Sequence, residues 1–121
     1  MAIDERQAEA AAGEASGEPG VAITGPLYLG AMHFDGDPGD LLPAYHRMLE
    51  RFGIDALDVH LCIVRGDGLT VLDACPGKAV HEEFTRSDTF RGAVAAAGLP
   101  APRIEGLGDI HVAHLSHEVR P

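Results

Sequence analysis

Hydrophobic and polar residues alternate most clearly between residues 56 and 75, in two runs separated by a short turn. The turn contains Gly66-Asp-Gly68, and such a sequence between alternating runs is typical of a β-hairpin. If Val64 pairs with Leu69, then His60 lies opposite Asp73 on the other strand. One face of this hairpin is apolar and consists of Val59, Leu61, Ile63, Thr70, Leu72 and Ala74. The other face carries Asp58, His60, Cys62, Asp73 and Cys75.

The residues on either side of the hairpin predict two further strands and two helical stretches. Residues 27–34 are expected to form the first strand. A helix follows, with Asp40 as its cap and Gly53 at its end, because apolar residues recur there at helical spacing. A second helical stretch begins after residues 76–77, restarts at Ser87 and ends at Gly98. Residues 108–115 are expected to form the last strand.

This order of elements, β-α-β-β-α-β, predicts an α+β domain of the ferredoxin-like type with a four-stranded antiparallel sheet. In that arrangement both helices cover one face of the sheet. We expect the apolar hairpin face to lie under the helices, extended by Ile110 and Val112. The opposite face would carry His60, Asp73 and His111. A bare sheet face is normally hidden by association, so two copies are expected to enclose a partly polar chamber.

Length, charge and composition narrow the possible functions. A chain of 121 residues is large enough for one domain, which we place at residues 27–121. Residues 1–26 are acidic and poor in large apolar side chains, which predicts a flexible tail. The net charge of −10 argues against nucleic acid and membranes as partners. No apolar run suggests a secretion signal, so we expect a cytoplasmic protein with reduced cysteines.

Residues 27–115 resemble the dimeric α/β-barrel superfamily, in particular its antibiotic-biosynthesis-monooxygenase-like (ABM-like) domains. The matching features are the first strand ending in His33-Phe34, the Asp-Pro start of the helix and the Gly-Asp-Gly hairpin. The broken second helix, from Phe84 to Pro100, is similar to the helix-break-helix of that family. Together these features cover about three quarters of the chain.

The resemblance implies a homodimeric small-molecule enzyme that oxygenates or isomerises a small aromatic or polyketide-like substrate. It does not supply an active site. The cofactor-independent monooxygenases and the haem-degrading members of the superfamily both use Asn and Trp, and this chain contains neither residue. Fold likeness alone therefore says little about the reaction.

The residues themselves point to a cluster of His60, Asp73 and His111, joined by His33 on a neighbouring strand. Such a set matches the ligands of one divalent transition metal, and without a bound metal the pocket is expected to be free of cofactors. The same side chains also suit general acid–base catalysis, or a hydrogen-bonded network that is only structural. The alternative to an enzyme is a dimeric module that binds a metal or a ligand without catalysis.

A substrate pocket is expected between the sheet and the helices. The residues expected to contact a small-molecule substrate are Tyr28, Tyr45, His81, Phe84 and Arg103. Phenol and guanidinium groups in such a pocket suit an anionic or phenolic ligand.

Overall fold

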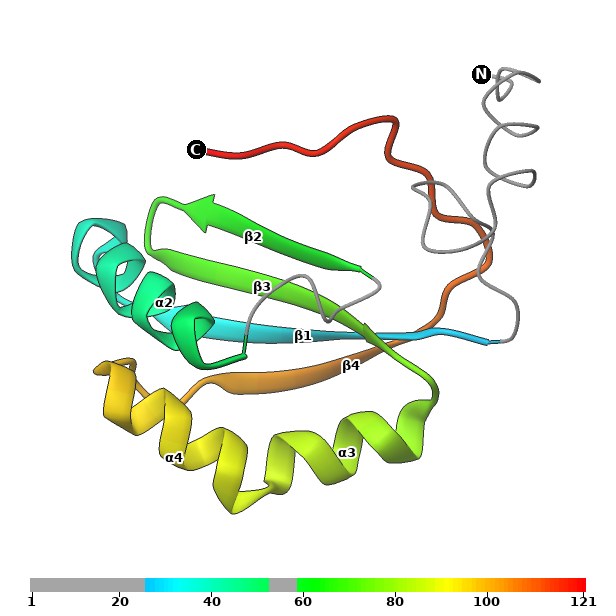
Figure 1. Cartoon of the computed structure of the whole chain (residues 1–121), viewed down its shortest axis with the longest axis horizontal. Coiled ribbons are helices and arrows are strands. Elements are labelled where there is room, and N and C mark those ends of the chain that lie inside the picture. Colours follow the sequence, from blue (N-terminus) through cyan, green and yellow to red (C-terminus); the bar gives the residue numbers. More distant parts are fainter. Residues whose placement is uncertain (1–25, 53–58) are drawn as a thin grey trace.

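The structure is a computed structural model that describes residues 26–52 and 59–121. Its strands are β1 (Tyr28–Asp35), β2 (His60–Arg65), β3 (Gly68–Cys75) and β4 (Arg103–Asp109), and its helices are α2 (Pro38–Phe52), α3 (Lys78–Arg86) and α4 (Asp88–Ala97) (Figure 1). The strands form one antiparallel sheet in the order β2-β3-β1-β4. This α+β architecture is consistent with the expected ferredoxin-like fold. Residues 1–25 of the predicted tail and the predicted helix end at Gly53 lie outside the described residues.

Local sequence signals explain where the helices begin and end. Helix α2 begins at Pro38, and Asp37 caps it by accepting a hydrogen bond from the backbone N–H of Gly39 at 2.9 Å. The prediction of Asp40 as the cap was wrong, because Pro38 is already suited to the first helical position. Ser87 separates α3 from α4 and accepts a hydrogen bond from the N–H of Phe90, as predicted. Gly98 ends α4 with a φ of 87°, a left-handed conformation that glycine adopts without strain.

The predicted register of the hairpin is confirmed. Val64 pairs with Leu69, and His60 pairs with Asp73. The two glycines at 66 and 68 allow the tight turn between the alternating strands. Both side chains of the His60–Asp73 pair therefore lie on the same face of the sheet.

The assignment of the two faces was wrong. Helix α2 covers the face that carries His60 and Asp73, and not the apolar face of the hairpin. Strand β1 explains why, because it brings Phe34 opposite Leu69 and Met32 opposite Val71 on that same face. These four side chains are at most 5% exposed and form the centre of the core with α2 and α4. The sequence of the hairpin alone did not reveal which face is buried. The polar residues of the covered face lie only at the end away from the turn, and Leu69 and Val71 share that face.

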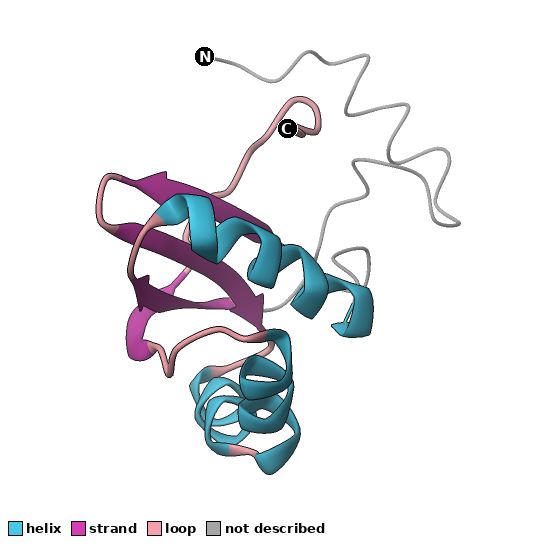
Figure 2. Ribbon diagram, turned by 90° about the vertical axis from the view of Figure 1, so that its left-hand side faces the viewer, coloured by secondary structure: helices cyan, strands magenta, loops and turns pink. Residues whose placement is uncertain are grey.

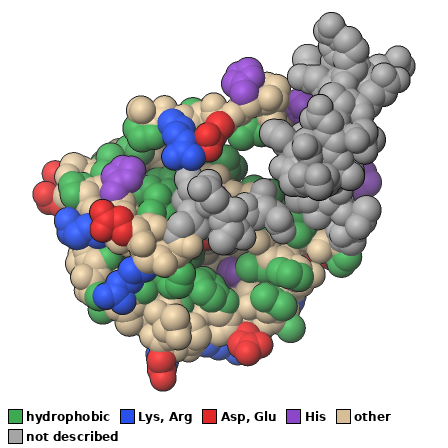
Figure 3. Space-filling model, in the orientation of Figure 1, with side chains coloured by type: hydrophobic (Ala, Val, Ile, Leu, Met, Phe, Trp, Pro, Cys, Tyr) green, Lys and Arg blue, Asp and Glu red, His purple; other side chains and the backbone are tan. Residues whose placement is uncertain are grey.

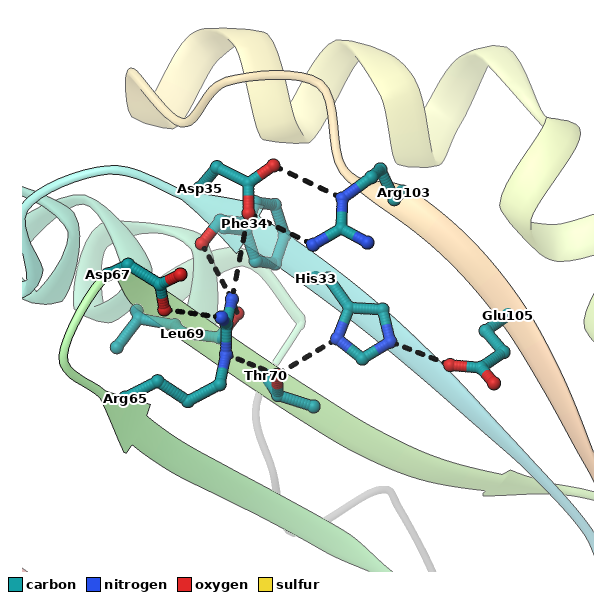
Figure 4. A network of polar contacts seen from close by, with 9 residues as sticks. All are labelled: His33, Phe34, Asp35, Arg65, Asp67, Leu69, Thr70, Arg103 and Glu105. Carbon is teal, nitrogen blue, oxygen red and sulfur yellow. Dashed lines mark hydrogen bonds and ion pairs between the residues drawn. The ribbon is translucent and has the colours of Figure 1, made fainter.

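The opposite face of the sheet has no helix over it among the described residues (Figure 2). Leu61 and Ile63 are 39% and 44% exposed there. One end of this open face carries a polar network around Arg65, His33 and Arg103 (Figure 4). Arg65 donates to Thr70 at 2.9 Å and to Asp67 at 2.6 Å, and Arg103 donates both its Nε and Nη2 hydrogens to Asp35. This network makes one end of the open face polar. Leu61 and Ile63 lie beside it on β2.

The last strand lies earlier in the chain than predicted. Strand β4 spans Arg103–Asp109 and pairs with β1, whereas residues 110–121 form neither helix nor strand. The glycines at 106 and 108 obscure the alternation that would identify a strand. These glycines are tolerated because β4 lies at the edge of the sheet and pairs with only one neighbouring strand. In the part of the chain that the structure describes, no helix is long and apolar enough to cross a membrane.

The two faces can be distinguished by truncating one leucine on each. Leu69→Ala removes a side chain that is fully buried under the helices, and we expect it to lower the free energy of unfolding by about 2–5 kcal/mol. Leu61→Ala removes the same group from the open face and should cost less than about 1 kcal/mol. Urea unfolding in dilute solution measures both changes. Equal losses, or a larger loss for Leu61→Ala, would contradict the assignment of the faces.

Candidate functional site

A cavity of about 390 Å³ lies between the sheet, the C-terminal half of α2, and α3. Its size falls within the range of about 300–1,000 Å³ that is usual for small-molecule sites. Apolar side chains line most of it: Met32, Met48, Leu49, Phe52, Val80, Phe84 and Phe90. Hydrophobic side chains gather in this area between the end of α2 and α3 in the space-filling view (Figure 3). The polar groups in its wall come chiefly from His60, Asp73 and His81.

Three polar side chains form a hydrogen-bonded chain beside the cavity. His60 Nδ1 and Asp73 Oδ1 are 2.5 Å apart, and His60 Nε2 and the hydroxyl of Tyr45 are also 2.5 Å apart. With a neutral imidazole, one arrangement of protons satisfies both contacts: Tyr45 O–H donates to Nε2, and Nδ1–H donates to the carboxylate. The Tyr45 and His60 rings are nearly parallel, at an angle of 6°. The chain fixes the position of Asp73 relative to helix α2.

Burial controls the ionisation of the groups at the inner end of this chain. Burial raises the pKa of the Tyr45 phenol, and the neighbouring Cys62 and Asp73 raise it further. Burial also raises the pKa of both thiols, Cys62 and Cys75, and the charge of Asp73 acts in the same direction. The cysteines are therefore thiols at neutral pH, which argues against a nucleophilic role for either of them.

The groups that remain free to meet a ligand are Asp73 and His81. No described residue hydrogen-bonds the second carboxylate oxygen of Asp73, Oδ2, and this side chain is 17% exposed. His81 is 6% exposed, and its Nε2 atom is buried without a hydrogen-bond partner among the described residues. A buried polar atom without a partner is rare in proteins because it costs about 1–3 kcal/mol. Because His81 lies in the wall of the cavity, a ligand or a water molecule there could supply this partner.

Two glycines allow His81 and Tyr28 to lie directly on the sheet. A Cβ atom at Gly30 would come within 2.1 Å of the His81 ring, and one at Gly106 would come within 2.1 Å of the Tyr28 hydroxyl. Gly30 and Gly106 are paired across β1 and β4, and Gly30 also pairs with Asp73 on β3. The missing side chains thus bring His81 close to Asp73. Sequence reasoning missed this pair, although a glycine inside a strand is a signal of close approach.

The structure brings together only some of the residues predicted for the site. His60, Asp73, His81 and Phe84 all line the cavity. Tyr45 does not line the cavity, but its hydroxyl contacts His60. Tyr28 lies beside His81, with the ring centres 5.6 Å apart. His33, His111 and Arg103 are elsewhere.

His33 and Arg103 lie on the open face, where His33 contacts Thr70 and Glu105 at 2.9 Å (Figure 4). His111 lies beyond β4 and is exposed, since the last strand ends at Asp109. The metal set of His33, His60, Asp73 and His111 is therefore not assembled. In residues 26–52 and 59–121, no group of three or more His, Cys, Asp or Glu side chains is placed to hold a metal ion.

Comparison of the sequence with models of known protein families finds no match, and comparisons with curated proteins and with solved structures find none either. The chemistry of the site must therefore be inferred from its own geometry.

The raised pKa of Tyr45 predicts that the protein loses stability in alkaline solution. In the unfolded chain the phenol ionises near its ordinary pKa of about 10, whereas in the folded protein it keeps its proton to higher pH. The unfolded state then binds fewer protons, so the free energy of unfolding falls as the pH rises above about 10. Urea unfolding between about pH 8 and pH 11 measures this slope. In Tyr45→Phe the slope should be shallower, and an unchanged slope would contradict the role of Tyr45.

Proposed function

We propose that the protein is an acid–base enzyme of the ABM-like kind that isomerises a small aromatic or polyketide-like molecule in the cavity. The observation that supports this most directly is the pair of free polar groups, Asp73 Oδ2 and His81 Nε2, in the wall of a largely apolar cavity. An apolar pocket with a few convergent polar groups is the usual form of a small-molecule site. No metal or cofactor is needed for the proton transfer described below.

Each polar group has a distinct role in this proposal. Asp73 is the general base, which removes a proton from a carbon next to a carbonyl and returns it to a second carbon. His60 holds Asp73 in place through Oδ1 and leaves Oδ2 directed to the substrate. His81 donates a hydrogen bond from Nε2 to the carbonyl oxygen, on which negative charge develops. The apolar surroundings strengthen this hydrogen bond, because the charge is poorly screened there.

The geometry favours isomerisation over oxygenation among the reactions expected from the sequence. A proton shift requires one base and one group that donates a hydrogen bond to the substrate. In this proposal Asp73 is the base and His81 is the donor. Oxygenation would additionally require a place for oxygen beside the substrate carbanion. It would begin with the same removal of a proton, so one experiment detects the first step of either reaction.

The proposed proton transfer can be detected without knowledge of the natural substrate. Indanone and tetralone are small aromatic ketones with acidic C–H groups, and in D₂O we expect the protein to accelerate their exchange of hydrogen for deuterium. NMR follows this exchange directly. Asp73→Asn keeps an oxygen that can accept the hydrogen bond of His60 but removes the base, so it should slow exchange by at least about 100-fold.

Asp88→Asn provides a matched control, because it makes the same change at a side chain that is 99% exposed on α4. It should exchange the ketones at the wild-type rate. If the ketones bind but neither the wild type nor Asp88→Asn accelerates exchange, the protein would instead be a non-catalytic binding module, which is the alternative function. Equal rates for wild type and Asp73→Asn would refute the role of Asp73.

We further propose that the protein is a homodimer that pairs through the open face of the sheet. Leu61 and Ile63 are 39% and 44% exposed on this face, and clustered exposed apolar residues are typical of interaction surfaces. The polar network at the end of this face carries charges of both signs, so a second copy can meet it with opposite charges. The face that carries His60 and Asp73, which the sequence suggested as the interface, is covered by the helices.

A charged residue beside Leu61 on the open face should break this dimer. Ile63→Asp would place an unpaired carboxylate in the interface, and we expect sedimentation to show a monomer at micromolar concentration while the wild type is a dimer. Val112→Asp alters an apolar residue that is 77% exposed in the C-terminal segment, and it should leave the dimer intact. A monomeric wild-type protein would contradict the proposal.

A further inference from the structure

A second hollow, of about 430 Å³, opens beside the cavity on the side of strand β4. It shares His81 and Thr85 with the cavity, so the two spaces meet at these side chains. Its wall differs in chemistry from that of the cavity, since Tyr28, Lys78, Glu82 and Arg86 contribute polar groups to it. Nothing in the acid–base chemistry of Asp73 uses this second space.

The floor of the hollow consists of two aromatic rings that lie on the paired glycines of the sheet. Tyr28 is 8% exposed and His81 is 6% exposed. The Tyr28 hydroxyl lies above Gly106, and no described residue hydrogen-bonds it. His81 Nε2 has no partner either. Two nearly buried side chains thus keep hydrogen-bonding groups that no described residue satisfies.

The rim of the hollow carries a small excess of positive charge. Lys78 and Arg86 each lie four residues from Glu82, one on either side, and Glu82 contacts them at 4.0 and 3.6 Å. Two positive charges share one negative charge, so the rim has a net charge of about +1 in a chain whose net charge is −10. This excess matches a group with a single negative charge.

We propose that the ligand of the cavity is a small monocarboxylic acid whose carboxylate lies in this hollow. Its apolar body would fill the cavity, and its carboxylate would accept hydrogen bonds from the Tyr28 hydroxyl and from Lys78 and Arg86. Asp73 reinforces this orientation, because its negative charge repels an acid group from the cavity itself. The inference rests on the proposed function, since it assumes that the cavity binds the apolar part of the ligand.

Phenylbutanoate and phenylbutanol test this inference, because they share an apolar body and differ only in the charged head group. Calorimetric titration at neutral pH should show that the wild-type protein binds the acid about tenfold more tightly than the alcohol. In the double variant K78Q/R86Q the preference should fall to about twofold or less, with unchanged affinity for the alcohol. Tyr28→Phe should reduce the preference by about threefold. The double variant R91Q/R120Q changes the net charge equally at positions outside the hollow, so it should retain the full preference.

The possible results separate the two proposals. Equal affinity of the wild type for acid and alcohol would overturn the inference about the carboxylate and leave the cavity as a ligand site. Loss of the preference in R91Q/R120Q as well would also overturn it, because the cause would then be the overall charge. Tighter binding of the phosphate monoester of phenylbutanol would overturn the choice of a monoanion. Failure of both acid and alcohol to bind would overturn the inference together with the proposed function.

Discussion

A carboxylate, an imidazole and a phenol lie in line between the hairpin and helix α2, and each is hydrogen-bonded to the next. Any one of these groups would cost about 1–3 kcal/mol if it were buried without a partner. Together they satisfy one another, so Asp73 and His60 can lie under a helix. The arrangement has two consequences for the molecule. It attaches α2 to the sheet at the end of the core, and it holds a carboxylate at the wall of a cavity with one oxygen uncommitted.

The second constraint on the site is the absence of two side chains. Gly30 and Gly106 face the helices side by side, where any other residue would collide with His81 or Tyr28. The space above them is therefore occupied by the aromatic rings of His81, from α3, and of Tyr28, from the start of β1. These rings separate an apolar cavity from a polar hollow and present a hydrogen-bonding group to each. The division into two chemically different spaces leads directly to a ligand with an apolar body and a charged head.

The sequence predicted the order of the elements and the hairpin register, because alternation and turn residues are local signals. It also predicted the break between α3 and α4, since Ser87 is a recognisable cap. It did not predict which face of the hairpin is buried, because that depends on pairing with Phe34 and Met32 of β1. Strand β4 was misplaced because Gly106 and Gly108 interrupt its alternation, and the reason for Gly106, the Tyr28 ring above it, appears only in the folded structure.

The candidate site was predicted in the same partial way. The His60–Asp73 pair followed from the register alone, and its hydrogen bond is present. The prediction that His33 and His111 join this pair was wrong. It depended on which face of the sheet is covered and on where the last strand lies, and the sequence predicted neither correctly. His81 and Phe84 were correctly placed in the pocket because they follow the inward face of a helix. Arg103 was misassigned, since its carboxylate partner Asp35 lies on the open face of the neighbouring strand.

The chain from Asp73 through His60 to Tyr45 can be tested most directly by nitrogen-15 NMR of the histidine side chains. The structure predicts that His60 carries a slowly exchanging proton on Nδ1, held by Asp73, and that Nε2 accepts the hydrogen bond of Tyr45. In Asp73→Ala this proton should exchange rapidly with water, and in Tyr45→Phe it should remain. A His60 that carries its proton on Nε2 alone, or an Nδ1 proton that survives in Asp73→Ala, would contradict the account.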